Sequence, residues 1–142
     1  MTVIKNMKVT VAYNHFRPGL TQRMPRVRFG YVHVVNNNYE PWGSYAIGGS
    51  MHPTIRSEGN RFVAPSSTNL KEVTWRENCG GGDPTCPNGW LWVSVGDQFL
   101  NGAYFNASGK GTAVPPYSAG QQFAVGRGSS VQAMTTQAGA LN

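Results

Sequence analysis

A phrase of three residues, Asn then any residue then an aromatic ring, recurs at a fixed interval in the first half of the chain. It occurs as Asn14-His15-Phe16, Asn37-Asn38-Tyr39 and Asn60-Arg61-Phe62, so each asparagine follows the previous one by 23 residues. This interval is too short for a strand–helix–strand unit, which needs about 30 residues. It suits one coil of a parallel β-solenoid, in which successive turns stack on one another. We therefore expect the asparagines to form a hydrogen-bonded column at one corner and the rings to stack in the core.

Strand-like segments precede the repeated phrase. Residues 9–13 and 31–35 are rich in β-branched and aromatic residues and are bounded by Gly, Pro and Asn, and Thr54-Ile55 is a shorter match. Three copies are few, so a chance repeat within a plain antiparallel β-domain is the alternative interpretation.

The period fades in the second half of the chain. Residues 65–89 read as a long loop with room for one short helical turn, and residues 89–105 read as two further strand segments. Trp90 and Trp92 alternate as neighbours on one face of a strand would, and we favour core packing over a sugar-binding platform for them. Residues 106–142, rich in Gly, Ala, Ser, Thr and Gln, predict an irregular tail that packs on the domain or trails from it.

Glycine and proline are too frequent for a helical bundle. The chain has 18 glycines and 9 prolines among 142 residues, and they would interrupt nearly every candidate helix. The length suits a single domain. No apolar run approaches the roughly 18 residues of a membrane span, and the first residues lack the apolar stretch and cleavage site of a secretory signal peptide.

The positive charge is concentrated in the first third of the chain. The net charge is +6, and the first acidic residue is Glu40. Residues 1–39 hold six basic residues: Lys5, Lys8, Arg17, Arg23, Arg26 and Arg28. Such a local positive field favours an anionic partner such as nucleic acid, an acidic polysaccharide or an acidic membrane surface, and the alternative is a solvated basic surface.

The two cysteines lie close together in a turn-rich stretch. Cys79 and Cys86 allow a small disulfide-closed loop, which would indicate an oxidising compartment, and two free thiols are the alternative. A zinc site would need four ligands, and no Cys-x2-Cys or His pair stands nearby. Asn106-Ala107-Ser108 fits the N-glycosylation acceptor pattern and makes Asn106 a candidate glycosylation site.

The densest chemical signal is a group of arginines around a proline. Arg23, Arg26 and Arg28 surround Pro25, which restricts its own backbone and that of the residue before it. In an extended chain, Arg26 and Arg28 point to the same face. Arginine is well suited to bidentate capture of carboxylate or phosphate, so we expect a structured anion site rather than a solvated loop.

At these residues the sequence resembles a known family. The stretches VTVAYNHF, QRMPRVRFGYVHVVNNNY, YAIGGSMHPTIRSEGNRFVAP and KEVT are similar to the C-terminal half of plant pectate lyases and their pollen-allergen relatives. The resemblance runs from about residue 5 to about residue 105 and implies an all-β fold, a right-handed parallel β-helix. Residues 1–105 would then be its C-terminal coils, with residues 106–142 as the tail.

The resemblance also implies roles for the arginine group. The family motif Arg-x-Pro-x-x-Arg is matched from Arg23 to Arg28. Arg23 would be the catalytic base that removes the C5 proton of a galacturonate unit in a β-elimination, and Arg28 would hold a substrate carboxylate. Pro25 would set the geometry between them, and Arg26 would be an extra contact with polygalacturonate.

Further expectations follow from the same resemblance. It implies Ca²⁺ as cofactor, pectin or polygalacturonate as the partner, and a secreted monomer of the plant cell wall that binds neither nucleic acid nor membrane. An arginine side chain ordinarily has a pKa above about 12, so it needs cations nearby to act as a base. The calcium carboxylates and the catalytic lysine of the family are expected upstream of residue 9, and we therefore expect this chain alone to be inactive.

Three other functions compete with a lyase. A truncated, non-catalytic pectin-binding β-helix would have the same fold without the elimination. A glycoside hydrolase would need paired carboxylates, and the acids here are isolated in sequence. A nucleic-acid binder is suggested by charge alone, without a binding module. Among the histidines, His33 lies in a strand pattern and is expected to be structural rather than a ligand.

Overall fold

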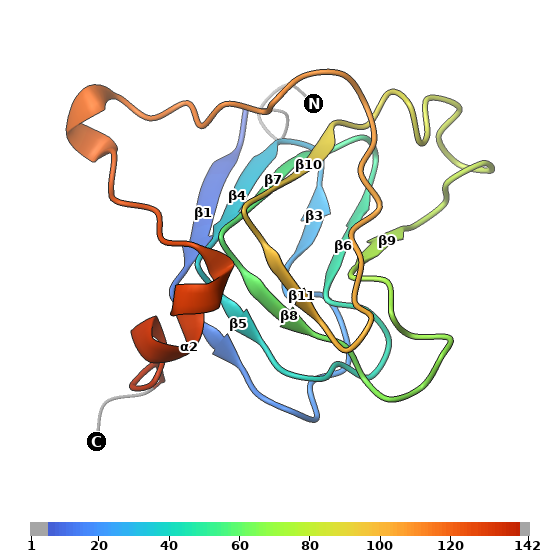
Figure 1. Cartoon of the computed structure of the whole chain (residues 1–142). Helices are drawn as coiled ribbons and strands as arrows, with labels where there is room; N and C mark the ends of the chain where they lie inside the picture. Colours follow the sequence, from blue (N-terminus) through green and yellow to red (C-terminus); the bar gives the residue numbers. More distant parts are fainter. Residues whose placement is uncertain (1–5, 140–142) are drawn as a thin grey trace.

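The computed structural model describes residues 6–139, and its strands form three parallel sheets around one core (Figure 1). The first sheet contains β1 (Lys8–Ala12), β4 (Tyr31–Val35), β7 (Thr54–Glu58) and β10 (Trp92–Val95). The second contains β2 (His15–Phe16), β5 (Asn38–Tyr39), β8 (Arg61–Val63) and β11 (Gln98–Leu100). The third contains β3 (Arg26–Arg28), β6 (Ile47–Ser50) and β9 (Thr74–Arg76). The predicted right-handed parallel β-helix is confirmed.

The repeated asparagines form the predicted column. Asn14 donates from its backbone and side-chain nitrogens to Oδ1 of Asn37, each over 3.0 Å, and Asn37 donates in the same way to Asn60 over 2.8 and 3.1 Å. Asn60 donates to Oδ1 of Asp97 over 2.7 and 3.1 Å. The column therefore continues one coil beyond the repeat and ends on a carboxylate.

The aromatic rings of the repeat stack as predicted. Phe16 lies on Tyr39 and Tyr39 on Phe62, with ring centroids 4.7 Å apart in both pairs. Phe99 extends the stack, 5.6 Å from Phe62. Its position was not predicted, because the last coil is longer: Asp97 follows Asn60 by 37 residues.

The second half of the chain differs in part from the sequence-based expectation. Within residues 65–89, where a loop with a helical turn was expected, the structure has strand β9 and no helix. Trp90 and Trp92 are fully buried in the hydrophobic core, which confirms core packing. The Cys79–Cys86 disulfide is present, so the predicted covalent loop is confirmed.

The tail packs across the outer face of the first sheet (Figure 1). It contains the short helices η1 (Ala119–Gln121), η2 (Gly128–Ser130) and α2 (Val131–Met134). The backbone of Gly126 is hydrogen-bonded to the Asn36 side chain in both directions. No helix in the part of the chain that the structure describes has the length and apolar character of a membrane span.

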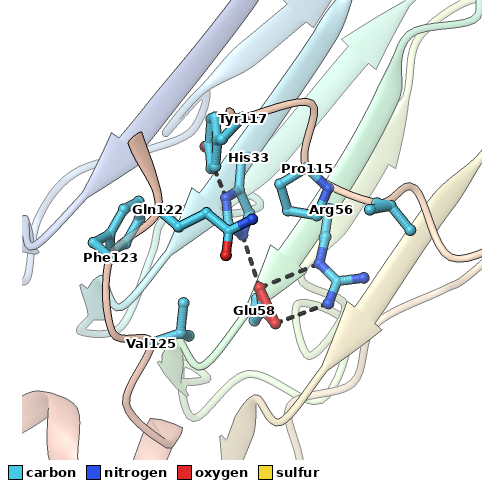
Figure 2. Close-up of a pocket in the computed structure, with 9 residues that line it drawn as sticks. His33, Arg56, Glu58, Pro115, Tyr117, Gln122, Phe123 and Val125 are labelled. Carbon is cyan, nitrogen blue, oxygen red and sulfur yellow. Dashed lines mark hydrogen bonds and ion pairs between the residues drawn. The ribbon is translucent and has the colours of Figure 1, made fainter. Parts of the chain in front are cut away.

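His33 is buried between the first sheet and the tail (Figure 2). Its Nδ1 lies 2.9 Å from the Tyr117 hydroxyl of the tail, and its Nε2 lies 2.9 Å from Glu58. Arg56 also pairs with Glu58, at 2.8 Å. Burial lowers the pKa of His33 below its ordinary value, although Glu58 opposes the shift. With both ring nitrogens hydrogen-bonded, His33 has the structural role that its strand position indicated.

Candidate active site

The third sheet presents the arginine group to solvent. In β3 the side chains alternate, so Arg26 and Arg28 are exposed on one face while Val27 is buried in the core on the other. Arg26 reaches across to the next coil and donates to the Ser50 hydroxyl over 3.1 Å. The strand geometry thus places two cations on the same outer surface.

Arg23 precedes this strand and is held by its neighbour Met24. The Met24 side chain is buried in the core, and its backbone N–H donates to the Ala46 carbonyl over 2.8 Å. The Tyr39 hydroxyl donates to the Met24 carbonyl over 2.5 Å. Arg23 itself has φ of 66°, a left-handed conformation that non-glycine residues rarely adopt without support from their surroundings. These contacts fix the backbone from which the exposed Arg23 side chain projects.

Glu77 joins two of the arginines. Its Oε2 accepts from Nη2 and Nε of Arg26, over 2.7 and 3.1 Å, and its Oε1 lies 3.5 Å from Nη2 of Arg23. The hydrogen bonds from Arg26 hold the pKa of Glu77 below its ordinary value, so the carboxyl is charged at neutral pH. Sequence reasoning did not connect Glu77 with the arginines, because the two lie far apart in the chain and the spacing in this sheet is irregular.

A second chain of contacts links Arg28 to the disulfide loop. The Arg28 guanidinium lies 5.0 Å from the centre of the Phe29 ring, and Phe29 makes an edge contact with His52. His52 Nδ1 is 2.9 Å from the Asp83 carboxylate inside the Cys79–Cys86 loop. Hydrogen bonds from Thr85 and then His52 lower the pKa of Asp83 to about 2. The disulfide loop therefore lies against the residues beside Arg28.

The surface as a whole suits an anion rather than a cation. Within residues 6–139, the carboxylate that pairs with Arg23 and Arg26 is Glu77, and its hydrogen bonds come from Arg26. Among residues 6–139 there is no group of three or more His, Cys, Asp or Glu side chains that could hold a metal ion. Guanidinium groups on an open surface bind carboxylates in bidentate geometry.

Residues 4–138 match the family model for pectate lyase. The chain belongs to the pectate lyase family. It is 56% identical over 136 residues to "Probable pectate lyase 16" of Arabidopsis thaliana, and this alignment covers 96% of this chain and 33% of that protein. It is 53% identical over 137 residues to "Pectate lyase 1" of Chamaecyparis obtusa, and this alignment covers 96% of this chain and 36% of that protein.

A solved structure agrees with this pectate lyase membership. The crystal structure of Jun a 1, the major allergen from cedar pollen, superposes with a TM-score of 0.90 and 52% sequence identity, over 97% of this chain and 39% of that chain. This chain thus spans about a third of the length of the curated relatives that it matches.

Two of the residues singled out in the sequence, Asn106 and Lys5, have no assigned role in the structure. Asn106 is exposed, as an acceptor for glycosylation must be, but its modification stays a prediction. Lys5, one of the basic residues of the first third, lies outside the described residues. The structure brings Arg23, Arg26 and Arg28 to one region of the third sheet and adds Glu77 to them.

Proposed function

We propose that this chain carries the arginine half of a pectate lyase active site, which cleaves galacturonan by β-elimination. The observation that supports the proposal most directly is the display of three arginines on one outer surface, on a chain of the pectate lyase family. In this reaction the C5–H bond breaks, electrons move to form a C4–C5 double bond, and the C4–O bond to the next sugar breaks. The charge that develops on the C5 carboxylate is what cationic side chains stabilise.

We assign the roles by position. Arg28, exposed in β3, grips the carboxylate of the galacturonate unit that reacts. Arg23, in its neutral form, accepts the C5 proton and becomes a guanidinium cation; Met24 fixes its backbone, and its exposed side chain projects toward the substrate surface. Arg26 is already engaged with Glu77 and Ser50, so it positions these neighbours and adds positive charge to the surface.

The described residues offer no cluster of carboxylates for an ion that takes six to eight oxygen ligands, and Glu77 is paired with Arg26. We therefore propose that calcium used in the reaction is held by groups outside residues 6–139, and we assign no step to it. The chain alone is expected to bind polygalacturonate in a salt-sensitive way and to release no unsaturated product.

We propose a secreted protein of the plant cell wall, where pectin is found. The Cys79–Cys86 disulfide supports this location, because disulfides persist in oxidising compartments and are rare in the cytosol.

A chimera tests the catalytic assignment. The chain would replace the matching third of "Pectate lyase 1" of Chamaecyparis obtusa, and ultraviolet absorbance would report unsaturated product. We expect an active chimera in which Arg23→Lys lowers kcat by about a hundredfold or more with little change in binding, since only the transition state loses its base. Arg17→Lys, at an exposed arginine outside the group, is the matched control. Normal turnover in the Arg23→Lys chimera would contradict the assignment.

A further inference from the structure

An exposed tryptophan lies in register with the arginines of the third sheet. Arg26 of β3 pairs with Gly48 of β6, and Gly48 pairs with Trp75 of β9. Paired residues in neighbouring parallel strands share a face, so Arg26 and Trp75 lie on the same outer surface. They are two strand spacings apart, about 9–10 Å.

Trp75 is exposed but supported from one side. It is 54% exposed, and its ring lies nearly parallel to that of Tyr45, with an interplanar angle of 17° and centroids 6.1 Å apart. Tyr45 is itself buried and rests over Gly48, where an added Cβ would lie only 2.6 Å from the Tyr45 ring. The glycine therefore makes room for Tyr45, and Tyr45 holds the indole in place beside the arginine row.

Polar groups border the indole. A shallow hollow of about 120 Å³ lies between Trp75 and the preceding loops. The Ser44, Asn69 and Glu72 residues line it. Glu72 accepts a hydrogen bond from Thr74 through one carboxylate oxygen, which leaves the other oxygen without a hydrogen bond to a described residue. A flat apolar surface edged with hydrogen-bonding groups matches a sugar ring, which has C–H faces and hydroxyl edges, better than a purely apolar ligand.

We propose that Trp75, backed by Tyr45, forms a saccharide subsite for a galacturonan strand that also lies on the arginine group. The C–H groups of a pyranose face carry partial positive charge and pack against the negative face of an indole. One galacturonate unit rests on Trp75 while the carboxylates of other units in the strand reach the arginines. The inference rests on the proposed function, because it takes the same substrate and extends the surface that binds it.

The protein contains its own probe for this subsite. Trp42, Trp90 and Trp92 are at most 2% exposed, so Trp75 is the tryptophan that a soluble quencher such as acrylamide can reach. We expect a galacturonate hexamer to protect the chain's fluorescence from quenching. A dimer, whose two carboxylates favour the arginines and leave Trp75 uncovered, should protect it far less.

Variants separate the subsite from the arginines. Trp75→Ala should weaken hexamer binding about tenfold and leave dimer binding unchanged, while Trp75→Tyr restores most of the affinity. Arg28→Ala should weaken the binding of both lengths. Tyr13→Asn is the matched control: it removes an exposed ring beside the tail, and asparagine tolerates the positive φ at that position.

The outcomes distinguish the subsite from the proposed function. If Trp75→Ala binds the hexamer as tightly as the wild type while Arg28→Ala does not, the subsite is refuted and the proposed function stands. If the wild type binds neither oligomer, both are refuted. Loss of hexamer affinity in Trp75→Ala alone, with rescue by Trp75→Tyr, supports the subsite.

Discussion

The hydroxyl of Tyr39 connects the aromatic stack of the core to the segment that carries Arg23. The ring is a member of the stack, and the hydroxyl donates to the carbonyl of Met24, directly after Arg23 in the chain. Burial raises the pKa of Tyr39 well above its ordinary value, so this hydroxyl remains a donor at any working pH. A single side chain thus supports both the solenoid core and the backbone at the candidate site.

Removing that hydroxyl should affect stability and catalysis together. Tyr39→Phe leaves the Met24 carbonyl buried without its donor and is expected to cost about 1–2 kcal/mol in the free energy of unfolding. In the chimera it should lower kcat about tenfold with little change in KM, because Arg23 loses part of its support. Tyr31→Phe is the control. Tyr31 lies in the first sheet, away from the arginine group, and its hydroxyl makes a similar hydrogen bond to the Ala113 carbonyl. An equal loss of kcat in both variants would mean that the effect is general destabilisation.

Glu77 should weaken the attraction of the arginine surface for pectin. Glu77→Gln removes the negative charge beside Arg23 and Arg26, and we expect affinity for polygalacturonate to rise about fivefold at low salt, with a steeper salt dependence. Binding titrations at several salt concentrations measure both effects. Glu40→Gln, at a carboxylate that pairs with His15 and Arg61 instead, should change neither.

At the scale of elements, the asparagine column ends on a carboxylate that is only partly compensated. Asp97 accepts from Asn60, and its second oxygen accepts from the hydroxyls of Ser57 and Ser94 over 2.7 and 2.6 Å. Burial nevertheless raises the pKa of Asp97 from 3.8 to about 6, because these neutral donors do not replace the solvation of a charge. In the folded chain, Asp97 therefore binds its proton more tightly than in the unfolded chain.

The direction of the resulting pH dependence follows from that difference. Between pH 3.8 and about 6 the folded state holds more protons than the unfolded state, so the contribution of Asp97 to stability falls as pH rises through this window. Asp97→Asn keeps an oxygen that can accept the hydrogen bonds of Asn60 at the end of the asparagine column, and it removes the titratable carboxyl group. We expect the difference in unfolding free energy between Asp97→Asn and wild type to grow by about 1–3 kcal/mol from pH 4 to pH 7 in urea denaturation. A difference that is constant with pH would contradict the assignment.

The two columns of the solenoid were predictable, because their repeat is strict. One interval separates the successive asparagines Asn14, Asn37 and Asn60 and the aromatic rings near them. In each coil the asparagine hydrogen-bonds to the next asparagine and the ring stacks on the next ring. Hydrogen bonding and stacking between neighbouring coils require that identity of position, so the pattern is visible in the sequence.

The third sheet was harder to predict, and it carries the candidate site. β6 has the sequence Ile-Gly-Gly-Ser and β3 has Arg-Val-Arg, and neither resembles the β-branched segments that indicate strands. Their spacing is set by loops of different length, so no period relates Arg26 to Trp75 or Glu77. The alternation of Trp90 and Trp92 correctly indicated core packing, whereas no pattern in the sequence singled out Trp75, which is the exposed tryptophan.

At the scale of the whole molecule, the tail converts an outer sheet face into an interior. His33 faces away from the solenoid core but is only 1% exposed, because Tyr117 and Phe123 of the tail pack against it. The surroundings of its ring include Glu58, Arg56 and the Tyr117 hydroxyl (Figure 2). Burial opposes the protonation of this histidine, so the neutral form favours the docked tail.

Acid should loosen the tail before the solenoid unfolds. Because the pKa of His33 is lower in the folded chain than in the unfolded one, its contribution to stability is complete above about pH 6.5 and is lost as pH falls below that value. We expect amide hydrogen exchange in residues 114–125 to accelerate between pH 7 and 5 relative to β7, after correction for intrinsic rates. His33→Gln, a neutral replacement, should flatten this difference, and an unchanged profile in that variant would assign the effect to another group.

The longer last coil has a consequence for protein engineering. Asp97 follows Asn60 by 37 residues instead of 23, yet it still caps the asparagine column and Phe99 still stacks on Phe62. Most of the additional residues lie between β9 and β10, where Cys79 and Cys86 form a covalent bridge, and a smaller number lie between β8 and β9. A scaffold that accepts extra length at a corner without shifting its neighbours is suited to carrying a foreign peptide. Gly80 and Gly81 are the natural place to graft one, because they have open space around them and precede the anchored Asp83.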